Sequence, residues 1–308
     1  MAFRVSTAGQ QQVILTGLFQ NQARVFEGQR QINTGKISDD YAGLAGNAST
    51  ILDSRAFQAR VETYRSSIDT VRGNLEANDN QLQGMISAME ELQDQIRAAI
   101  ANNEAQGFSE LLDQTFSFVT STLNTSFNGA FLFAGADTGT RPVNVNTLPD
   151  LAALGTVADA FDNSDVGFQA RIADDVDIQF GLLADDIATD SLQVMLDLYN
   201  FDTGAGGPFD GELTAAQVTE LQARLGDIDN AIGTLRTQQA NNGLVFGRLE
   251  VVDDQHAETR DFLRIFIDEL EGVDVAEAIT NLDLDRVALQ ASYQAVASLN
   301  QLTLLNFI

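Results

Sequence analysis

Few residues of this 308-residue chain have side chains suited to catalysis. The chain has no cysteine and a single histidine, His256, so a nucleophilic triad could be built only around that histidine. Nothing near His256 supplies a nucleophile on a sharp turn. His256 is instead spaced by seven residues from both Leu249 and Leu263, which favours a place in a helical seam. We therefore expect a structural histidine and a protein that is not an enzyme.

Three further segments contain residues that bind metals or phosphate in other proteins. Residues 162–167 resemble the start of a calcium loop, but the fifth position is apolar and no glutamate occupies the twelfth. Asp174, Asp175 and Asp177 could pair carboxylates for acid-base work, yet a hairpin turn explains them without chemistry. No lysine of a phosphate loop follows the glycine-rich residues 204–207. We expect no catalytic residue, metal or cofactor.

The elements that carry these residues are predicted to be mainly helical. Between residues 61 and 99, apolar residues recur at alternating intervals of three and four residues over six heptads, with one polar break at Asn78. This period is typical of a coiled coil, in which the apolar positions of two helices interlock. The predicted seam positions in this segment are Tyr64, Ile68, Val71, Leu75, Leu82 and Met89.

A second heptad segment follows Thr214, which has the spacing of a capping box with Gln217. Two consecutive three-residue steps near residues 242–252 join its two heptad frames. Such a step overwinds a coiled coil locally, so the sequence allows either a tighter helix or a break at residues 241–243. The predicted seam positions of the later frame are Leu249, Val252, Leu263, Phe266 and Leu270.

Both ends of the chain have the apolar spacing of amphipathic helices. An isolated helix of this length is marginal in water, so each end requires a partner, either the other end or another subunit. The residues predicted to form this assembly interface are Leu15, Leu18, Val25 and Ile32 near the N-terminus and Leu289, Tyr293, Val296, Leu299, Leu302 and Leu305 near the C-terminus.

The middle of the chain has a different sequence pattern, with signals for turns and strands. A helix is expected near residues 109–123, and Asn128-Gly129 indicates a tight turn. Residues 168–172 and 176–180 alternate apolar and polar side chains on either side of Asp174-Asp175, which predicts a β-hairpin. A short helix is expected at residues 190–198, before a glycine-rich connector.

The fold class that follows is mainly α. We expect a long antiparallel coiled-coil bundle formed by the N- and C-terminal segments, with a small β-containing (α+β) insertion. The expected domains are a terminal helical core (1–50 and 274–308), a coiled-coil domain (51–135 and 213–273) and a variable surface insertion (136–212) that contains the hairpin.

Charge and hydropathy restrict the partners. The net charge is -27, which argues against nucleic acid because phosphate binding needs a basic face. Residues 1–65 contain seven basic and five acidic residues, so the excess of acidic residues lies in the later segments. No window is apolar enough to span a membrane, and the first 30 residues lack the apolar core of a cleaved signal peptide.

Several motifs resemble those of one family. Residues 31–45 (QINTGKISDDYAGLA) resemble the signature shared by the flagellin superfamily. Within that superfamily, residues 3–7 (FRVST), 131–135 (FLFAG), 288–295 (ALQASYQA) and 302–308 (LTLLNFI) are similar to the hook-associated protein 3 family, whose members join the flagellar hook to the filament. Residues 42–45 (AGLA) are closer to flagellin itself. The resemblance covers roughly residues 1–135 and 213–308.

The resemblance implies a structural subunit of the bacterial flagellum at the hook–filament junction, where it would permit flagellin to polymerise. The terminal helices would form an inner tube by self-assembly, and the insertion would project outward. Neighbours would be flagellin and the adjacent hook-associated protein. Export to the extracellular flagellum would use the type III apparatus without a cleaved signal peptide, with a cytoplasmic chaperone on the C-terminal helix. The alternative is flagellin, the bulk filament subunit, and a more distant one is a coiled-coil tip or translocator protein of a type III secretion system.

Overall fold

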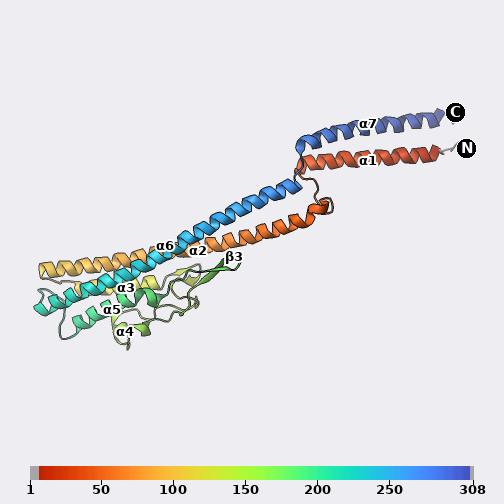
Figure 1. Cartoon of the computed structure of the whole chain (residues 1–308). Helices are drawn as coiled ribbons and strands as arrows, with labels where there is room; N and C mark the ends of the chain where they lie inside the picture. Colours follow the sequence, from red (N-terminus) through yellow and green to blue (C-terminus); the bar gives the residue numbers. More distant parts are fainter. Residues whose placement is uncertain (1–6, 306–308) are drawn as a thin grey trace. The chain divides into compact units, whose positions relative to one another are not determined.

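The computed structural model describes residues 7–305, except for the side chains of residues 7, 8, 10, 45 and 299–305. The described chain is mainly helical, with two small two-stranded antiparallel sheets (Figure 1). In chain order the elements are α1 (Thr7–Thr34), η1 (Ala45–Asn47), α2 (Ala48–Asn102), α3 (Phe108–Leu123), β1 (Ser126–Phe127), β2 (Ala130–Phe131), α4 (Leu148–Ala152), η2 (Val157–Ala160), β3 (Gln169–Ala173), β4 (Val176–Gln179), α5 (Ala184–Thr203), α6 (Ala215–Glu271) and α7 (Val275–Leu305).

The chain divides into two compact units. The first combines Met1–Arg60 with Thr259–Ile308, and we call it the terminal unit; the second is Val61–Glu258, which we call the central unit. The central unit contains the hairpin together with most of the coiled coil. The separation of residues 136–212 as a domain of their own stays a prediction.

Helix α6 runs without interruption from Ala215 to Glu271, so the alternative of a break at residues 241–243 is excluded. The helix begins with the predicted capping box. The Gln217 amide donates to the Thr214 hydroxyl (3.3 Å) and the Thr214 amide donates to the Gln217 side chain (2.8 Å). Gly272 follows the last residue of the helix.

In the central unit, α2 and α6 pair antiparallel. Gln93 on α2 donates to Asp229 on α6 (2.6 Å), and Arg65 donates to Asp253 (2.8 Å). Most of the predicted seam positions are buried between these helices and their neighbours. Ile68, Val71, Leu75, Leu82, Met89 and Leu249 are buried, whereas Tyr64 and Val252 are half-buried.

Both predicted turns are present between α3 and α5. Asn128 and Gly129 both have positive φ, as a tight hairpin turn between β1 and β2 requires. The hairpin of β3 and β4 turns at Asp174-Asp175, where Asp175 has a φ of 57°. The predicted hairpin is therefore confirmed.

Helix α5 is longer than the sequence indicates, since it spans Ala184–Thr203 rather than residues 190–198. Two aspartates in its first turn complement the helix dipole, and a buried face that includes Ile187, Leu192 and Met195 stabilises the whole length. The buried positions before residue 190 belong to the main hydrophobic core, so tertiary contacts extend the helix towards its N-terminus.

The hairpin of β3 and β4 packs on the coiled coil. Ile172 and Ile178 form a buried cluster with Ile68, Leu75 and other seam residues of α2 and α6. The ring of His256 lies 2.7 Å from the carbonyl oxygen of Ile172 through Nε2, and it stacks on Tyr64 with ring centroids 5.7 Å apart. The single histidine thus joins the hairpin to the coiled coil, in agreement with the structural role expected for it.

Candidate functional site

The candidate site is the pair of helices α1 and α7 in the terminal unit, which lie side by side and antiparallel (Figure 1). Polar contacts fix their register. The Asn21 side-chain amide donates to Ser292 (2.6 Å), Gln22 donates to the Tyr293 hydroxyl (2.7 Å), and Arg24 forms an ion pair with Asp285 (2.9 Å).

A close approach of the two backbones accompanies these polar contacts. A Cβ added at Gly28 would lie 3.4 Å from Cδ1 of Leu282, which is buried. Glycine thus allows α7 to approach α1 closely at this level. Sequence analysis missed both Asn21 and Gly28 as seam positions. Their spacing of three and four residues from Leu18, Val25 and Ile32 is a signal that could have revealed them.

The predicted interface residues fall into two groups. Leu18 is buried, and Val25, Ile32, Leu289 and Val296 are half-buried, which is consistent with the seam between α1 and α7. Leu15 and Tyr293 are exposed, with 42% and 49% of their surface accessible. The side chains of Leu299, Leu302 and Leu305 lie outside the described residues, as do residues 3–6 and 306–308 of the terminal motifs.

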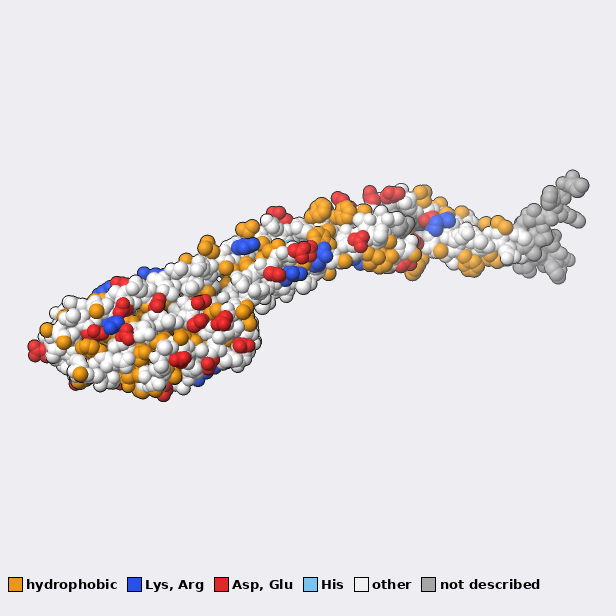
Figure 2. Space-filling view, turned by 60° about the horizontal axis from the view of Figure 1, so that its bottom comes forward, with side chains coloured by type: hydrophobic (Ala, Val, Ile, Leu, Met, Phe, Trp, Pro, Cys, Tyr) orange, Lys and Arg blue, Asp and Glu red, His pale blue; other side chains and the backbone are white. Residues whose placement is uncertain are grey.

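A second row of apolar side chains on α1 has no partner among the described residues. Phe19 is 64% exposed and Phe26 is 71% exposed, and their seven-residue spacing places them on one face of the helix together with Leu15. On α7, Leu284 and Val287 are 64% and 65% exposed. Figure 2 shows hydrophobic side chains at the surface of this part of the molecule. Sequence analysis missed Phe19 and Phe26, although two phenylalanines seven residues apart outside the seam are a recognisable signal.

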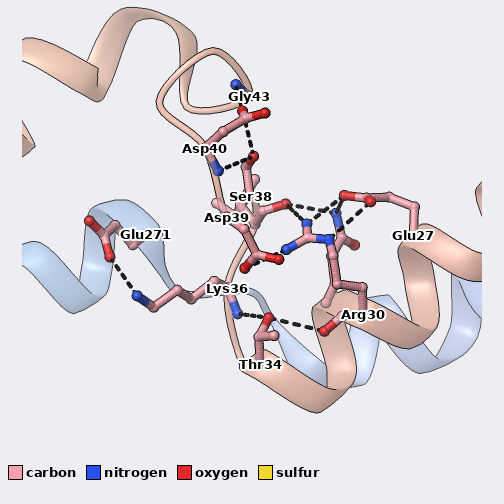
Figure 3. Close-up of polar contacts among 11 residues, drawn as sticks. Glu27, Arg30, Thr34, Lys36, Ser38, Asp39, Asp40, Gly43 and Glu271 are labelled. Atoms are coloured by element: carbon pink, nitrogen blue, oxygen red, sulfur yellow. Dashed lines mark hydrogen bonds and ion pairs between the residues drawn. The ribbon is translucent and has the colours of Figure 1, made fainter.

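The loop after α1 is held by charged side chains (Figure 3). Arg30 donates to Glu27 (2.5 Å) and forms an ion pair with Asp39 (2.8 Å). The hydrogen bond from Arg30 lowers the pKa of the Glu27 carboxyl. Further along, the Asp40 carboxylate accepts from the backbone amide of Gly43 (2.8 Å), which closes a turn. Within the signature motif, residues 31–34 thus complete α1, and the residues that follow form a tight loop before η1.

The same loop is joined to the corner between α6 and α7. The Ile37 amide donates to the Glu271 carbonyl oxygen (2.8 Å), and the Val273 amide donates to the Gly35 carbonyl oxygen (3.0 Å). The Lys36 ammonium lies 3.4 Å from the Glu271 carboxylate (Figure 3). These bonds join the chain just after the end of α1 to the chain just before the start of α7.

The remaining predicted seam residues also lie in the terminal unit. Leu263 is buried, and Phe266 and Leu270 are half-buried; Leu270 packs against a cluster of Leu44, Ile51 and Ile267.

Residues 7–305, the described part of the chain, show neither a metal-binding cluster nor a membrane-spanning helix. No group of three or more histidine, aspartate or glutamate side chains is arranged to hold a metal ion in this described part. No helix of the described residues is both long and apolar enough to cross a membrane. The arrangement offers apolar helical faces and polar register contacts, which suit packing against other helices.

Comparisons with known proteins agree with this arrangement. The family model described as the bacterial flagellin N-terminal helical region matches residues 5–138, and the model of the C-terminal helical region matches residues 216–308. No curated protein sequence matches the chain.

Two solved structures share the fold. One is from Vibrio parahaemolyticus and is described as a flagellar hook-associated protein; it is 16% identical, with a TM-score of 0.60, and the match covers 76% of this chain and 99% of that one. The other is FlgL of Bacillus cereus, which is 14% identical, with a TM-score of 0.56 and coverage of 70% and 99%.

Proposed function

Because this chain belongs to the bacterial flagellin family, we propose that it is a structural subunit that joins the flagellar hook to the filament. In this role a few copies form a ring on the hook, and flagellin polymerises on the far side of that ring. The subunit catalyses nothing. Its likeness in fold to two structures of hook-associated type supports the junction role over other places in the flagellum.

The observation that carries the proposal is the unpartnered apolar row of the α1–α7 pair. Both helices expose large apolar side chains, which are Phe19 and Phe26 on α1 and Leu284 and Val287 on α7. Removing one such side chain from water contributes about 1.5–3 kcal/mol, so a surface of this kind favours association. Copies of this chain, flagellin and the adjacent hook-associated protein are the partners that we propose for it.

The proposed route to that position is export through the flagellar type III apparatus without a cleaved signal peptide. A cytoplasmic chaperone would cover the C-terminal helix before export. The exposed apolar residues of α7 support this, since an unassembled subunit would otherwise present them to the cytoplasm. The final location is extracellular, in the flagellum.

Flagellin, the bulk filament subunit, is the second candidate. Residues 42–45 (AGLA) favour it, because this stretch resembles flagellin more than the junction family. Both candidates use the same helical faces and differ in copy number.

Deletion of the gene separates the two functions. A junction subunit predicts hooks without filaments and flagellin shed into the medium. Loss of filaments without shed flagellin would instead identify the bulk subunit. Filaments that remain attached to hooks would refute both. Electron microscopy of the cells and immunoblotting of the medium give the readout.

Complementation of the deletion tests the apolar row itself. Phe19→Asp combined with Phe26→Asp is expected to restore the protein level but not the attached filaments. The control is Val166→Asp, which places one aspartate charge at an apolar side chain that is 52% exposed in the insertion. The control should restore filaments. Attached filaments with the double variant would show that the row is not the assembly surface.

A further inference from the structure

A hollow of about 520 Å³ opens in the terminal unit beside the loop after α1. It lies among the start of α2, the end of α6 and the loop residue Lys36. The residues that line it include Lys36, Arg55, Gln58, Arg264, Ile265 and Glu271. Three basic side chains line this hollow, whereas the protein as a whole has a net charge of -27.

One carboxylate at the base of the hollow is shared by two cations. The Glu271 side chain is only 6% exposed, and its carboxylate lies 2.7 Å from the Arg55 guanidinium and 3.4 Å from the Lys36 ammonium. The side chains of Lys36 and Arg55 remain 46% and 41% exposed. Since a single carboxylate balances one of these two charges, a positive charge stays accessible at the mouth.

The third cation is not balanced by a partner of its own. Arg264 is exposed, and no carboxylate within the described part of the chain lies within ion-pair distance of it. Asp268 follows one helical turn later and also lines the hollow, yet the two do not pair. The five charged side chains of the hollow therefore sum to one net positive charge. A guanidinium in this setting has donors free for an incoming carboxylate.

An exposed apolar side chain lies beside Arg264 in the hollow. Ile265 lines the same hollow and is 56% exposed. Arginine and aromatic side chains are enriched at the centres of protein interfaces, where the apolar neighbours exclude water from the charged contact. The composition around Arg264 therefore fits a protein side chain better than a free anion.

We propose that this hollow binds a carboxylate side chain of a second copy of this chain, with Arg264 as its principal donor. The charge distribution identifies the occupant, because residues 66–308 contain 39 acidic but only 10 basic residues, whereas residues 1–65 have a basic excess. A second copy thus offers an excess of carboxylates over basic side chains in its later residues. The inference rests on the proposed self-assembly, but it concerns a different surface from the apolar row of α1 and α7.

Photocrosslinking in assembled flagella tests the proposal. The full-length protein with p-benzoylphenylalanine in place of Ile265 is expressed in the deletion strain, and sheared flagella with hooks are irradiated. Covalent dimers of this chain are expected, and mass spectrometry should locate the crosslink in a peptide that contains Asp or Glu. The second substitution Arg264→Glu should lower the dimer yield about tenfold, because it places two carboxylates opposite each other.

The matched control is Arg97→Glu, which changes the charge equally at an exposed arginine of the central unit and should leave the dimer yield unchanged. Thermal unfolding of the Arg264→Glu variant should match that of the parent, since Arg264 has no ion pair to lose. Arg97→Glu loses only an exposed ion pair with Asp94, which contributes little to stability, so its unfolding should also stay close to that of the parent. Absence of dimers, dimers unaffected by Arg264→Glu, or crosslinks only to a different protein would overturn the proposal. Filaments that are attached but give no crosslink would refute this inference while leaving the junction function intact.

Discussion

The side-chain amide of Asn242 on α6 donates to the backbone carbonyl oxygen of Leu75 on α2, across 2.8 Å in the seam of the coiled coil. Asn242 and the seam residue Asn78 are 5% and 1% exposed. The Oδ1 atom of each has no hydrogen-bond partner among the described residues. A buried polar group in a seam costs stability, and it specifies the register of the two helices because few alignments can accommodate it.

Replacing both asparagines by leucine should therefore stabilise the protein. We expect Asn78→Leu with Asn242→Leu to raise the free energy of unfolding by about 1–3 kcal/mol, since two unsatisfied oxygens are removed. Urea unfolding followed by circular dichroism measures the change. Glu76→Leu, at an exposed position of the same helix, should leave the midpoint nearly unchanged. A lower midpoint in the double variant would contradict this reading.

The register should become less specific at the same time. Spin labels at the exposed positions Ser66 and Glu250 are expected to give one narrow distance distribution in the parent protein. The double leucine variant should broaden that distribution or add a second distance. An unchanged distribution would mean that the apolar positions alone fix the register.

The pair of Arg65 and Asp253 predicts a loss of stability in acid. The hydrogen bond from Arg65 lowers the pKa of the Asp253 carboxyl, with a smaller contribution from Arg72. A carboxyl whose pKa is lower in the folded state stabilises the protein above its unfolded pKa, about 3.9, and this contribution is lost as the pH falls through the lower folded value.

Asp253→Asn should thus cost about 1–3 kcal/mol at pH 7 and progressively less below pH 4. Denaturation curves at pH 7, 5 and 3 measure the difference from the parent. Asp254→Asn, at the exposed neighbouring position, serves as the control and should have little effect at any pH. A destabilisation by Asp253→Asn that did not change with pH would show that the charge is not what stabilises this contact.

The close approach at Gly28 predicts that a large side chain will separate α1 from α7. Gly28→Leu should lower the stability of the terminal unit, because its Cβ alone would already contact Leu282 at 3.4 Å. Gly17→Leu is the matched control, since a Cβ there meets nothing within 4 Å. Hydrogen exchange of the α1 and α7 amides should accelerate in the first variant only. Equal protection in both would refute the close packing at Gly28.

Gly135 should be far less tolerant of a side chain than Gly129. Both have positive φ, which costs an alanine about 1–2 kcal/mol. At Gly135 a Cβ would also lie 2.5 Å from the Val166 carbonyl oxygen and 2.7 Å from the Leu183 side chain, whereas Gly129 faces open space. Thermal unfolding should therefore show a larger loss for Gly135→Ala than for Gly129→Ala. Equal losses would mean that the loop adjusts freely around Gly135.

Local signals in the sequence were enough to predict much of the fold. The heptad spacing from Ile68 to Met89, the capping box at Thr214 and the turn at Asp174-Asp175 all depend on contacts within a few residues or on one helical face, so they can be read without the partner. The bounds of helix α5 could not be predicted in this way, because its first turns are buried in a hydrophobic core built from residues distant in the sequence.

The sequence by itself determined that the chain ends are amphipathic helices that need a partner. It did not determine which apolar row meets that partner, because Leu18 and Phe19 are adjacent and both belong to rows with helical spacing. Only the tertiary structure decided this: Asn21, Gly28 and Leu282 orient α1 so that Leu18 is buried while Phe19 and Phe26 remain exposed. The physical reason is that spacing defines a face of a helix, whereas the choice between two faces depends on complementary side chains far away in the sequence.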